Sequence, residues 1–198
     1  MKTLTQIIFI LIIIISQPLY AETNPRIKEI IAERCSHCHG ENGEASNTIY
    51  PRLAGQHKEY MVKQLQNFRS GERTGTMNDI AKDLTDEEMI GLAEYFSAQP
   101  PAKHRVRDKE FAAVGKYIFF KGNKFSGVAS CSSCHGDKGH GTNKLPRLAG
   151  QHKRYVSIQL EEFNNRKRTN DNHIMQSVAA QLTEFEREAV SLYVSGLE

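Results

Sequence analysis

The sequence has little net charge and few residues that can cross-link a chain. Its 26 Lys and Arg nearly balance 23 Asp and Glu, which leaves +3 among 198 residues and argues against a nucleic-acid-binding protein. It has four cysteines and no tryptophan. Beyond residue 21 it lacks an apolar run of about 20 residues, the length that spans a bilayer, and it lacks the alternating pattern of β-strands. These absences argue against later membrane spans and favour a helical protein.

The first 21 residues have the pattern of a secretory signal peptide. Lys2 precedes an unbroken apolar run at 7–15, and the small residue Ala21 stands at the expected cleavage site. A retained membrane anchor is the alternative, but Ser16–Pro18 end the run before it reaches the length of a spanning helix. We therefore expect cleavage after Ala21 and an exported, soluble mature protein.

The mature sequence is an internal repeat. Cys35–Gly40 recurs in modified form at Cys131–Gly136, and Pro51–Lys58 recurs without change at Pro146–Lys153. Such a repeat indicates two copies of one fold. The stretch from Gln99 to Arg105 carries two prolines and no apolar periodicity, which is typical of a linker. We predict a signal peptide at 1–21, an N-terminal domain at 22–101 and a C-terminal domain at 102–198.

Each copy has the pattern of an all-α domain. Asn24 and Asp108 can cap the first helices, and Thr85 and Thr183 begin capping boxes for the last helices. In the middle of each copy, apolar residues recur at spacings of three and four and form one stripe. These are Met61, Leu65 and Phe68, and Val156, Leu160 and Phe163. Each domain is small, so we expect a large apolar cofactor to supply part of its core.

Each copy also contains one Cys-x-x-Cys-His motif, the attachment signature of c-type haem. The members are Cys35, Cys38 and His39 in the first copy and Cys131, Cys134 and His135 in the second. The two thiols of a motif reach the two vinyl groups of one porphyrin, and the histidine lies beneath the iron as an axial ligand. The motifs use all four cysteines, so we predict two covalent haem c groups.

Three other roles for paired cysteines fit less well. A zinc site needs two Cys-x-x-Cys pairs about 15–20 residues apart, whereas residues 39–130 separate these pairs. A thioredoxin-like pair needs a βαβ context, which the sequence lacks. Two disulfides suit an oxidising compartment but leave the histidine after each pair unexplained.

Comparison of the copies selects the second axial ligands. Met77 pairs with Met175 in the repeat, whereas Met61 and Met89 have no methionine counterpart. The offset between copies rises from 95 to 98 residues before Met175, so a three-residue insertion precedes it. Both paired methionines stand among Gly, Thr, Asn and Asp residues that indicate loops, and Met with His is a known haem ligand pair. We predict them as iron ligands, with His173 as the alternative in the second copy. The other histidines are predicted to be solvated or bonded locally: His37, His57, His104, His140 and His152.

Together these motifs resemble di-haem cytochromes c of the cytochrome c4 family. The resemblance covers the mature chain and rests on both haem motifs, the Pro-x-Leu-Ala-Gly-Gln run after each, the Tyr and Gln-Leu that follow, and one Met before each last helix. It implies two tandem class I cytochrome c domains, each wrapped around one haem. It also implies that His39 and Met77 ligate one iron. The second iron would have His135 and Met175.

The resemblance also assigns residues around the ligands. The carbonyls of Pro51 and Pro146 are expected to accept hydrogen bonds from the ligand histidines, which would fix the ring orientation. Six residues are candidates for contacts with the haem propionates: Arg52, Gln56, Tyr60, Arg147, Gln151 and Tyr155. Plain surface or helix packing is the alternative for these six.

The activity implied by the resemblance is electron transfer rather than enzymatic catalysis. The protein would pass single electrons between a quinol-oxidising respiratory complex and a terminal oxidase or reductase in the periplasm, as a monomer, with peripheral membrane association left open. A di-haem subunit of a dehydrogenase is one alternative, and a di-haem peroxidase with an open iron is another. Residues 22–101 carry 9 Lys and Arg against 13 Asp and Glu, and residues 102–198 carry 16 against 10. This asymmetry can orient the molecule toward charged partners, with ordinary solvated surfaces as the alternative.

Overall fold

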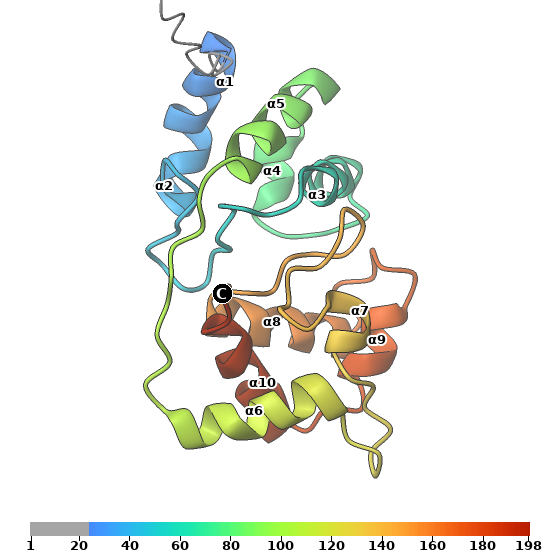
Figure 1. The fold of residues 1–198 in the computed structure, drawn as a ribbon. Helices are drawn as coiled ribbons and strands as arrows, with labels where there is room; N and C mark the ends of the chain where they lie inside the picture. The colour runs from blue at the N-terminus through green and yellow to red at the C-terminus, as the bar shows by residue number, and fades with distance from the viewer. Residues whose placement is uncertain (1–23) are drawn as a thin grey trace, which may run out of the picture.

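The protein folds into two helical lobes joined by one extended linker (Figure 1). The structure is a computed structural model that describes residues 24–198, so the predicted signal peptide lies outside the described residues. The first lobe contains α1 (Pro25–Ile30), the π-type turn η1 (Ile31–Cys35), α2 (Ser36–His39), α3 (Lys58–Ser70), α4 (Met77–Ala81) and α5 (Asp86–Ser97). The second contains α6 (Lys109–Lys121), α7 (Ser132–His135), α8 (Lys153–Asn164), α9 (Ile174–Ala179) and α10 (Glu184–Ser195). Over residues 24–198 the only β-type pairing is an isolated bridge between Asn123 and Val128, in agreement with the predicted all-α class.

The helices begin where the caps in the sequence indicate. The Asn24 side chain accepts a hydrogen bond from the Arg26 N–H at 2.8 Å, and Pro25 occupies the first position of α1. Thr85 and Thr183 each complete a capping box, at the starts of α5 and α10. These caps satisfy N–H groups that have no partner within the helix.

Each lobe has its own apolar core. In the first lobe, Ile30, Met89 and Phe96 are almost completely buried where α1 and α5 pack together beside α3. In the second lobe, Phe119 and Val194 are buried where α6 and α10 cross. The first cysteine of each motif packs against the edge of its core. Each core therefore extends to its cysteine motif.

The α6 and α10 helices approach most closely at a glycine. A Cβ atom on Gly115 would lie 2.0 Å from the Ala189 carbonyl oxygen, so no larger residue fits without moving a helix. At the matching contact between α1 and α5, a Cβ atom on Gly91 would meet the Ile27 side chain at 2.7 Å. The second contact is less restrictive because the tip of an isoleucine side chain can move.

We expect Gly115→Ala to lower the free energy of unfolding by about 2–3 kcal/mol, because the two helices must separate. Gly91→Ala is the matched control. Its expected cost is below about 1 kcal/mol, since Ile27 can shift and alanine favours a helix over glycine by about 1 kcal/mol. Denaturant unfolding measures both values, and equal costs would contradict the close crossing of α6 and α10.

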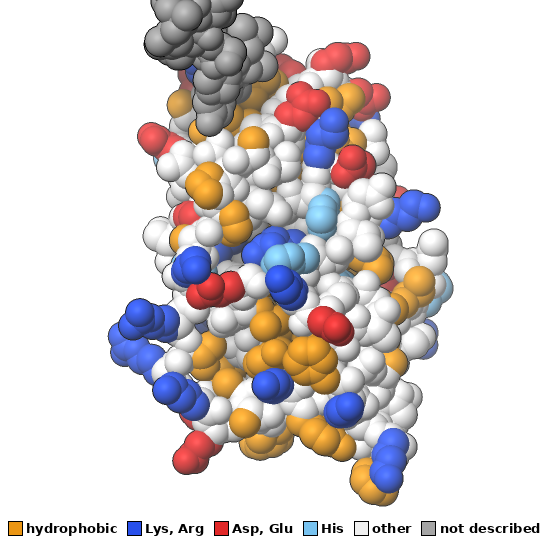
Figure 2. Space-filling model, viewed as in Figure 1, with side chains coloured by type: hydrophobic (Ala, Val, Ile, Leu, Met, Phe, Trp, Pro, Cys, Tyr) orange, Lys and Arg blue, Asp and Glu red, His pale blue; other side chains and the backbone are white. Residues whose placement is uncertain are grey.

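The linker and the outer surfaces carry much of the charge. Residues 98–108 run along one side of the molecule from α5 to α6 (Figure 1). Acidic side chains gather over the upper part of the first lobe, whereas Lys and Arg side chains follow the linker and the second lobe (Figure 2). In the part of the chain that the structure describes, no helix has both the length and the apolar character to cross a membrane.

Candidate functional site

The four cysteines form two pairs of free thiols. Cys35 ends η1 and Cys38 lies in α2, while Cys131 precedes α7 and Cys134 lies in it. Burial raises the pKa of Cys35 and of Cys131 to about 11. Among residues 24–198, no group of three or more His, Cys, Asp or Glu side chains is arranged to hold a metal ion. Each motif thus places one unpaired thiol at the edge of a core, one turn before the histidine, and a second directly before it.

His39 and His135 are buried, and each is held through one ring nitrogen. Nδ1 of His39 lies 2.9 Å from the Pro51 carbonyl oxygen, and Nδ1 of His135 lies 3.1 Å from that of Pro146. A carbonyl can only accept, so each Nδ1 carries the proton and each Nε2 keeps a free lone pair. Burial lowers the pKa of both imidazoles, although these hydrogen bonds oppose it. Each lobe therefore presents a neutral, oriented imidazole, the form that ligates a metal.

Met77 and Met175 lie in short helices and not in loops, so the loop prediction is wrong at these positions. Met77 is the first residue of α4 and Met175 the second of α9. Gly75 and Thr76 lie in the turn before α4 and residues 170–173 form the turn before α9, whereas Asn78 and Asp79 lie within α4. Both methionines are half-buried, and Met175 packs against the second core. The alternative ligand His173 is exposed, and its Nδ1 lies 2.8 Å from Gln176 Oε1.

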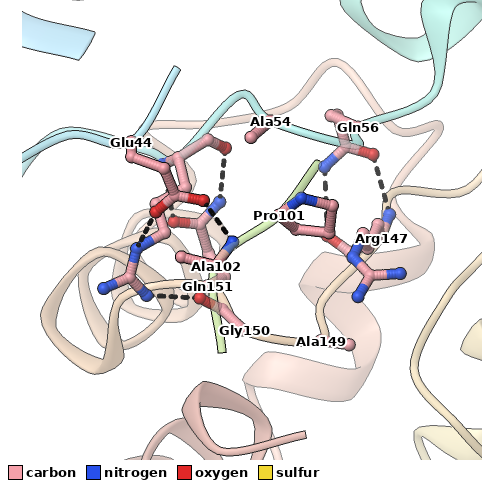
Figure 3. Close-up of a pocket in the computed structure, with 10 residues that line it drawn as sticks. Glu44, Ala54, Gln56, Pro101, Ala102, Arg147, Ala149, Gly150 and Gln151 are labelled. Atoms are coloured by element: carbon pink, nitrogen blue, oxygen red, sulfur yellow. Dashed lines mark hydrogen bonds and ion pairs between the residues drawn. The ribbon is translucent and has the colours of Figure 1, made fainter. Parts of the chain in front are cut away.

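The lobes meet through a reciprocal pair of glutamines (Figure 3). The Gln56 side chain accepts a hydrogen bond from the Arg147 backbone N–H at 2.8 Å and donates to the Arg147 carbonyl at 3.0 Å. Gln151 forms the same two bonds with the backbone of Arg52, both at 2.9 Å. Equivalent faces of the two copies therefore bind one another, as in a two-fold symmetric dimer.

Two histidines extend this symmetry. His57 Nε2 donates to the His140 carbonyl and His152 Nε2 donates to the Ala45 carbonyl, each at 2.7 Å. The prediction that these two histidines are solvated or bonded locally is therefore wrong. Their partners lie 83 and 107 residues away along the chain, and only the packing of the lobes brings them together.

The two arginines of the repeated run differ in their partners. Arg52 forms an ion pair with Glu44 at 3.0 Å and donates to the Gly150 carbonyl. The Arg147 Nε is buried without a hydrogen-bond partner within the described residues, and burial lowers the pKa of this guanidinium. Arg147 lines a small pocket between the lobes, together with Gln56 (Figure 3). It offers an unused donor for a carboxylate, the charged group at the edge of a haem.

A second symmetric group lies between α3 and α8, and we call it the arginine cluster. Its members are Tyr60, Gln64 and Arg73 from the first lobe and Tyr155, Gln159 and Arg168 from the second. Each arginine donates to the glutamine of its own lobe at 2.8 Å and to the tyrosine and glutamine of the other lobe. Both arginines are buried, with 8% and 6% of their surface exposed. Burial alone would raise the pKa of Tyr60, but the guanidinium groups of Arg168 and Arg73 outweigh it and lower the pKa.

Comparison with known proteins identifies the family. The Cytochrome c family model matches residues 26–119 and again residues 119–198. The chain is 41% identical to cytochrome c4 of Thiocapsa roseopersicina, over 82% of this chain and 86% of that protein. The chain belongs to the cytochrome c4 family. The crystal structure of reduced recombinant cytochrome c4 from Pseudomonas stutzeri matches with a TM-score of 0.81 and 32% identity, over 88% of this chain and 99% of that one. The thiosulfate dehydrogenase electron acceptor of Stutzerimonas stutzeri is 34% identical, over 84% of this chain and 80% of that protein.

As a member of the cytochrome c4 family, the protein carries two covalently bound haem c groups and is an electron carrier, not an enzyme. This confirms the predicted cofactor and the predicted class of function. The residues present fit the cofactor. Each lobe offers a pair of free thiols, a buried imidazole with an unprotonated Nε2 and a half-buried thioether, and Arg147 adds an unpaired donor.

Sequence reasoning missed the arginine cluster of this cytochrome c4-family protein. Its signal was visible, because Tyr60, Gln64 and Arg73 each return unchanged 95 residues later. Identity between copies has two explanations, however: both copies contact the same cofactor, or they contact each other. Only the three-dimensional structure separates the two, since it shows which repeated residues face the other lobe.

Proposed function

We propose that single electrons pass through two six-coordinate haems, each held by four residues of one lobe. The proposed sets are Cys35, Cys38, His39 and Met77 in the first lobe and Cys131, Cys134, His135 and Met175 in the second. The assignment rests chiefly on the buried imidazole of each lobe, which keeps its proton on Nδ1 and leaves Nε2 for the iron. When bound, haem iron cycles between two oxidation states that differ by one electron.

The chain's own part is to hold the ligands in place. The carbonyls of Pro51 and Pro146 fix the two imidazole rings and strengthen donation from Nε2. The thioethers of Met77 and Met175 would bind the iron opposite the imidazoles, exclude water from it and raise the reduction potential. With both axial positions filled, a change of oxidation state needs little movement of protein groups. No side chain has to act as an acid, a base or a nucleophile.

We assign the propionate contact to Arg147 among the six candidate residues. Gln56 and Gln151 bond the backbone of the other lobe, and Arg52 has Glu44 as its countercharge. The Tyr60 hydroxyl accepts a hydrogen bond from Arg168, and the Tyr155 hydroxyl accepts one from Arg73. Arg147 differs because its buried Nε has no partner among the described residues. A propionate bound there would offset the free-energy cost of burying a guanidinium without a countercharge.

Alanine at either proposed methionine ligand is expected to open one iron. Met77→Ala and Met175→Ala should each remove about half of the weak Met-to-iron charge-transfer absorption of the oxidised protein. Each reduced variant should bind carbon monoxide, and the parent protein should not. Visible spectroscopy checks both results.

His173→Ala serves as the control for Met175→Ala, because His173 is the alternative ligand. We expect this variant to keep the full charge-transfer band. If Met175→Ala keeps the band as well, or if the parent binds carbon monoxide readily at neutral pH, the proposed ligand set is refuted.

The proposed route of electrons runs in the periplasm, from a quinol-oxidising complex to a terminal oxidase or reductase. The predicted signal peptide and the covalent mode of haem attachment support this location. A second candidate donor is a thiosulfate dehydrogenase, because one relative carries the name of that enzyme's electron acceptor. Rapid-mixing measurements of haem reduction by each purified donor distinguish the two routes. The second lobe is basic. If the donor surface is acidic, we therefore expect the rate of haem reduction to fall as salt is added.

A further inference from the structure

The segment before Met175 differs from its counterpart before Met77 by an insertion. The copies keep an offset of 95 residues as far as Thr169 and of 98 residues from Met175 onward, so the three additional residues lie within 170–174. Two residues there, Asn172 and His173, have left-handed backbones, with φ of 55° and 65°. Such conformations are costly for residues other than glycine and persist only where neighbouring contacts hold them.

Asn170 holds the inserted segment against the other lobe. Its side chain is buried, and Nδ2 donates to Gln64 Oε1 at 3.0 Å and to Asn67 Oδ1 at 2.7 Å, both on α3 of the first lobe. The Asn170 carbonyl accepts a third hydrogen bond, from Lys63 Nζ at 3.0 Å. Within its own lobe, Asn170 Oδ1 accepts from Arg168 Nε at 3.1 Å. One residue of the segment that contains the insertion therefore bonds three side chains across the lobe interface.

The next residue connects this anchor to the methionine. The Asp171 carboxylate accepts a hydrogen bond from the Met175 backbone N–H and another from the His173 N–H at 3.2 Å. Asp171 thus fixes the start of α9, the helix that carries Met175. The chain of contacts runs from α3 through Asn170 and Asp171 to the proposed iron ligand.

The first methionine is held differently, because the side chain of the asparagine beside it bonds only within its own lobe. Asn78 Nδ2 donates to the carbonyls of Phe68 at 2.6 Å and Arg73 at 2.9 Å, and Asn78 Oδ1 accepts from the Gly75 N–H at 2.6 Å. These contacts brace the turn before α4 without a direct bond to the second lobe, although the Arg73 side chain donates to Tyr155 and Gln159 there.

We propose that Asn170 is a positioning residue through which the first lobe stabilises Met175 on the second iron. The inference rests on the proposed ligand role of Met175. Met175 is then joined to the other lobe through the side chain and carbonyl of Asn170, whereas the side chain of Asn78, beside Met77, has its contacts within the first lobe. The Asn170 contact would in this way tune the ligand strength, and so the potential, of the second haem more than that of the first.

The test measures the binding of each methionine to its iron separately. In a Met77→Ala background the remaining charge-transfer band reports Met175, and in a Met175→Ala background it reports Met77. In the Met77→Ala background, the Met175 band disappears at some alkaline pH. We expect Asn170→Ala to lower that pH by about 1 unit. This is a tenfold change in the ratio of bound to displaced methionine, or about 1.4 kcal/mol, the scale of a buried hydrogen bond.

The decisive variant lies in the other lobe. Asn67→Ala removes an acceptor of Asn170 and leaves the second lobe unchanged, so it should shift the Met175 band in the same direction. The double variant Asn67→Ala with Asn170→Ala should shift it no further than Asn170→Ala alone. Asn78→Ala is the matched control and should shift only the Met77 band.

The outcomes separate this inference from the proposed ligand set. If Met77→Ala and Met175→Ala do not each remove part of the band in the parent protein, the ligand set fails and the inference fails with it. If the ligand set holds but Asn170→Ala and Asn67→Ala leave the Met175 band unmoved, positioning by Asn170 is refuted. Equal shifts of both bands in Asn170→Ala also refute it, because they indicate a general loss of stability.

Discussion

Replacing both Cys131 and Cys134 by alanine is expected to leave one covalent haem per chain instead of two. The structure shows both thiols unpaired beside the buried His135, and the chain has no other cysteine in that lobe. Without thioether bonds a porphyrin in the second lobe is held only by its axial ligands and by packing. Haem counted against protein after acid extraction measures the covalent number. The second lobe should also unfold first, because a ring without thioether bonds dissociates more readily and that ring completes a small core.

The first lobe provides the matched variant for this prediction. Cys35→Ala with Cys38→Ala should also leave one covalent haem per chain, and the four-cysteine variant should leave none. Ser133→Ala, between the two cysteines of the second motif, is the control and should keep both haems. Two covalent haems in the Cys131 and Cys134 variant would contradict the assignment of the motifs.

Arg168→Met is expected to weaken the contact between the lobes by about 3 kcal/mol. The arginine is buried and donates to Tyr60 and Gln64 on the other lobe, and a methionine of similar length leaves both acceptors without that donor. Because two lobes that lose this contact can move apart, the variant should also be less compact. Denaturant unfolding gives the free energy, and small-angle X-ray scattering gives the radius of gyration.

Two comparisons control this result. Arg73→Met should weaken the contact by a similar free energy, because Arg73 makes the symmetry-related bonds to Tyr155 and Gln159. Arg154→Met removes an exposed arginine from α8 and should cost less than about 0.5 kcal/mol. If Arg168→Met matches Arg154→Met, the arginine cluster does not hold the lobes together.

Local signals in the sequence predicted the helix starts but not the backbone between them. Asn24, Thr85 and Thr183 act within four residues of their own position, so their capping role follows from the sequence. The π-type turn that ends at Cys35 has no such local signal. The short helix at Met77 was missed for a related reason: its turn is stabilised by Asn78 bonding carbonyls of preceding segments, and helix propensity does not report such contacts.

The residues around the ligands show a different limit. The repeat marked Gln56, Tyr60 and their counterparts as special, and the family resemblance suggested propionate contacts for them. In the structure their side chains have partners on the other lobe. The packing of one domain on another depends on surfaces that are distant in sequence, so a single sequence without the fold does not reveal it.

The reciprocal glutamine contact constrains how the two copies can diverge. Gln56 and Arg52 return in the second copy as Gln151 and Arg147, and a change of either glutamine removes one half of the reciprocal contact. The outer surfaces carry no such constraint and are free to drift apart. The net charges of residues 22–101 and 102–198, 9 − 13 = −4 and 16 − 10 = +6, show that drift. The two halves thus carry side-chain charges of opposite net sign, an asymmetry that can turn one end of the molecule toward a charged surface before contact is made.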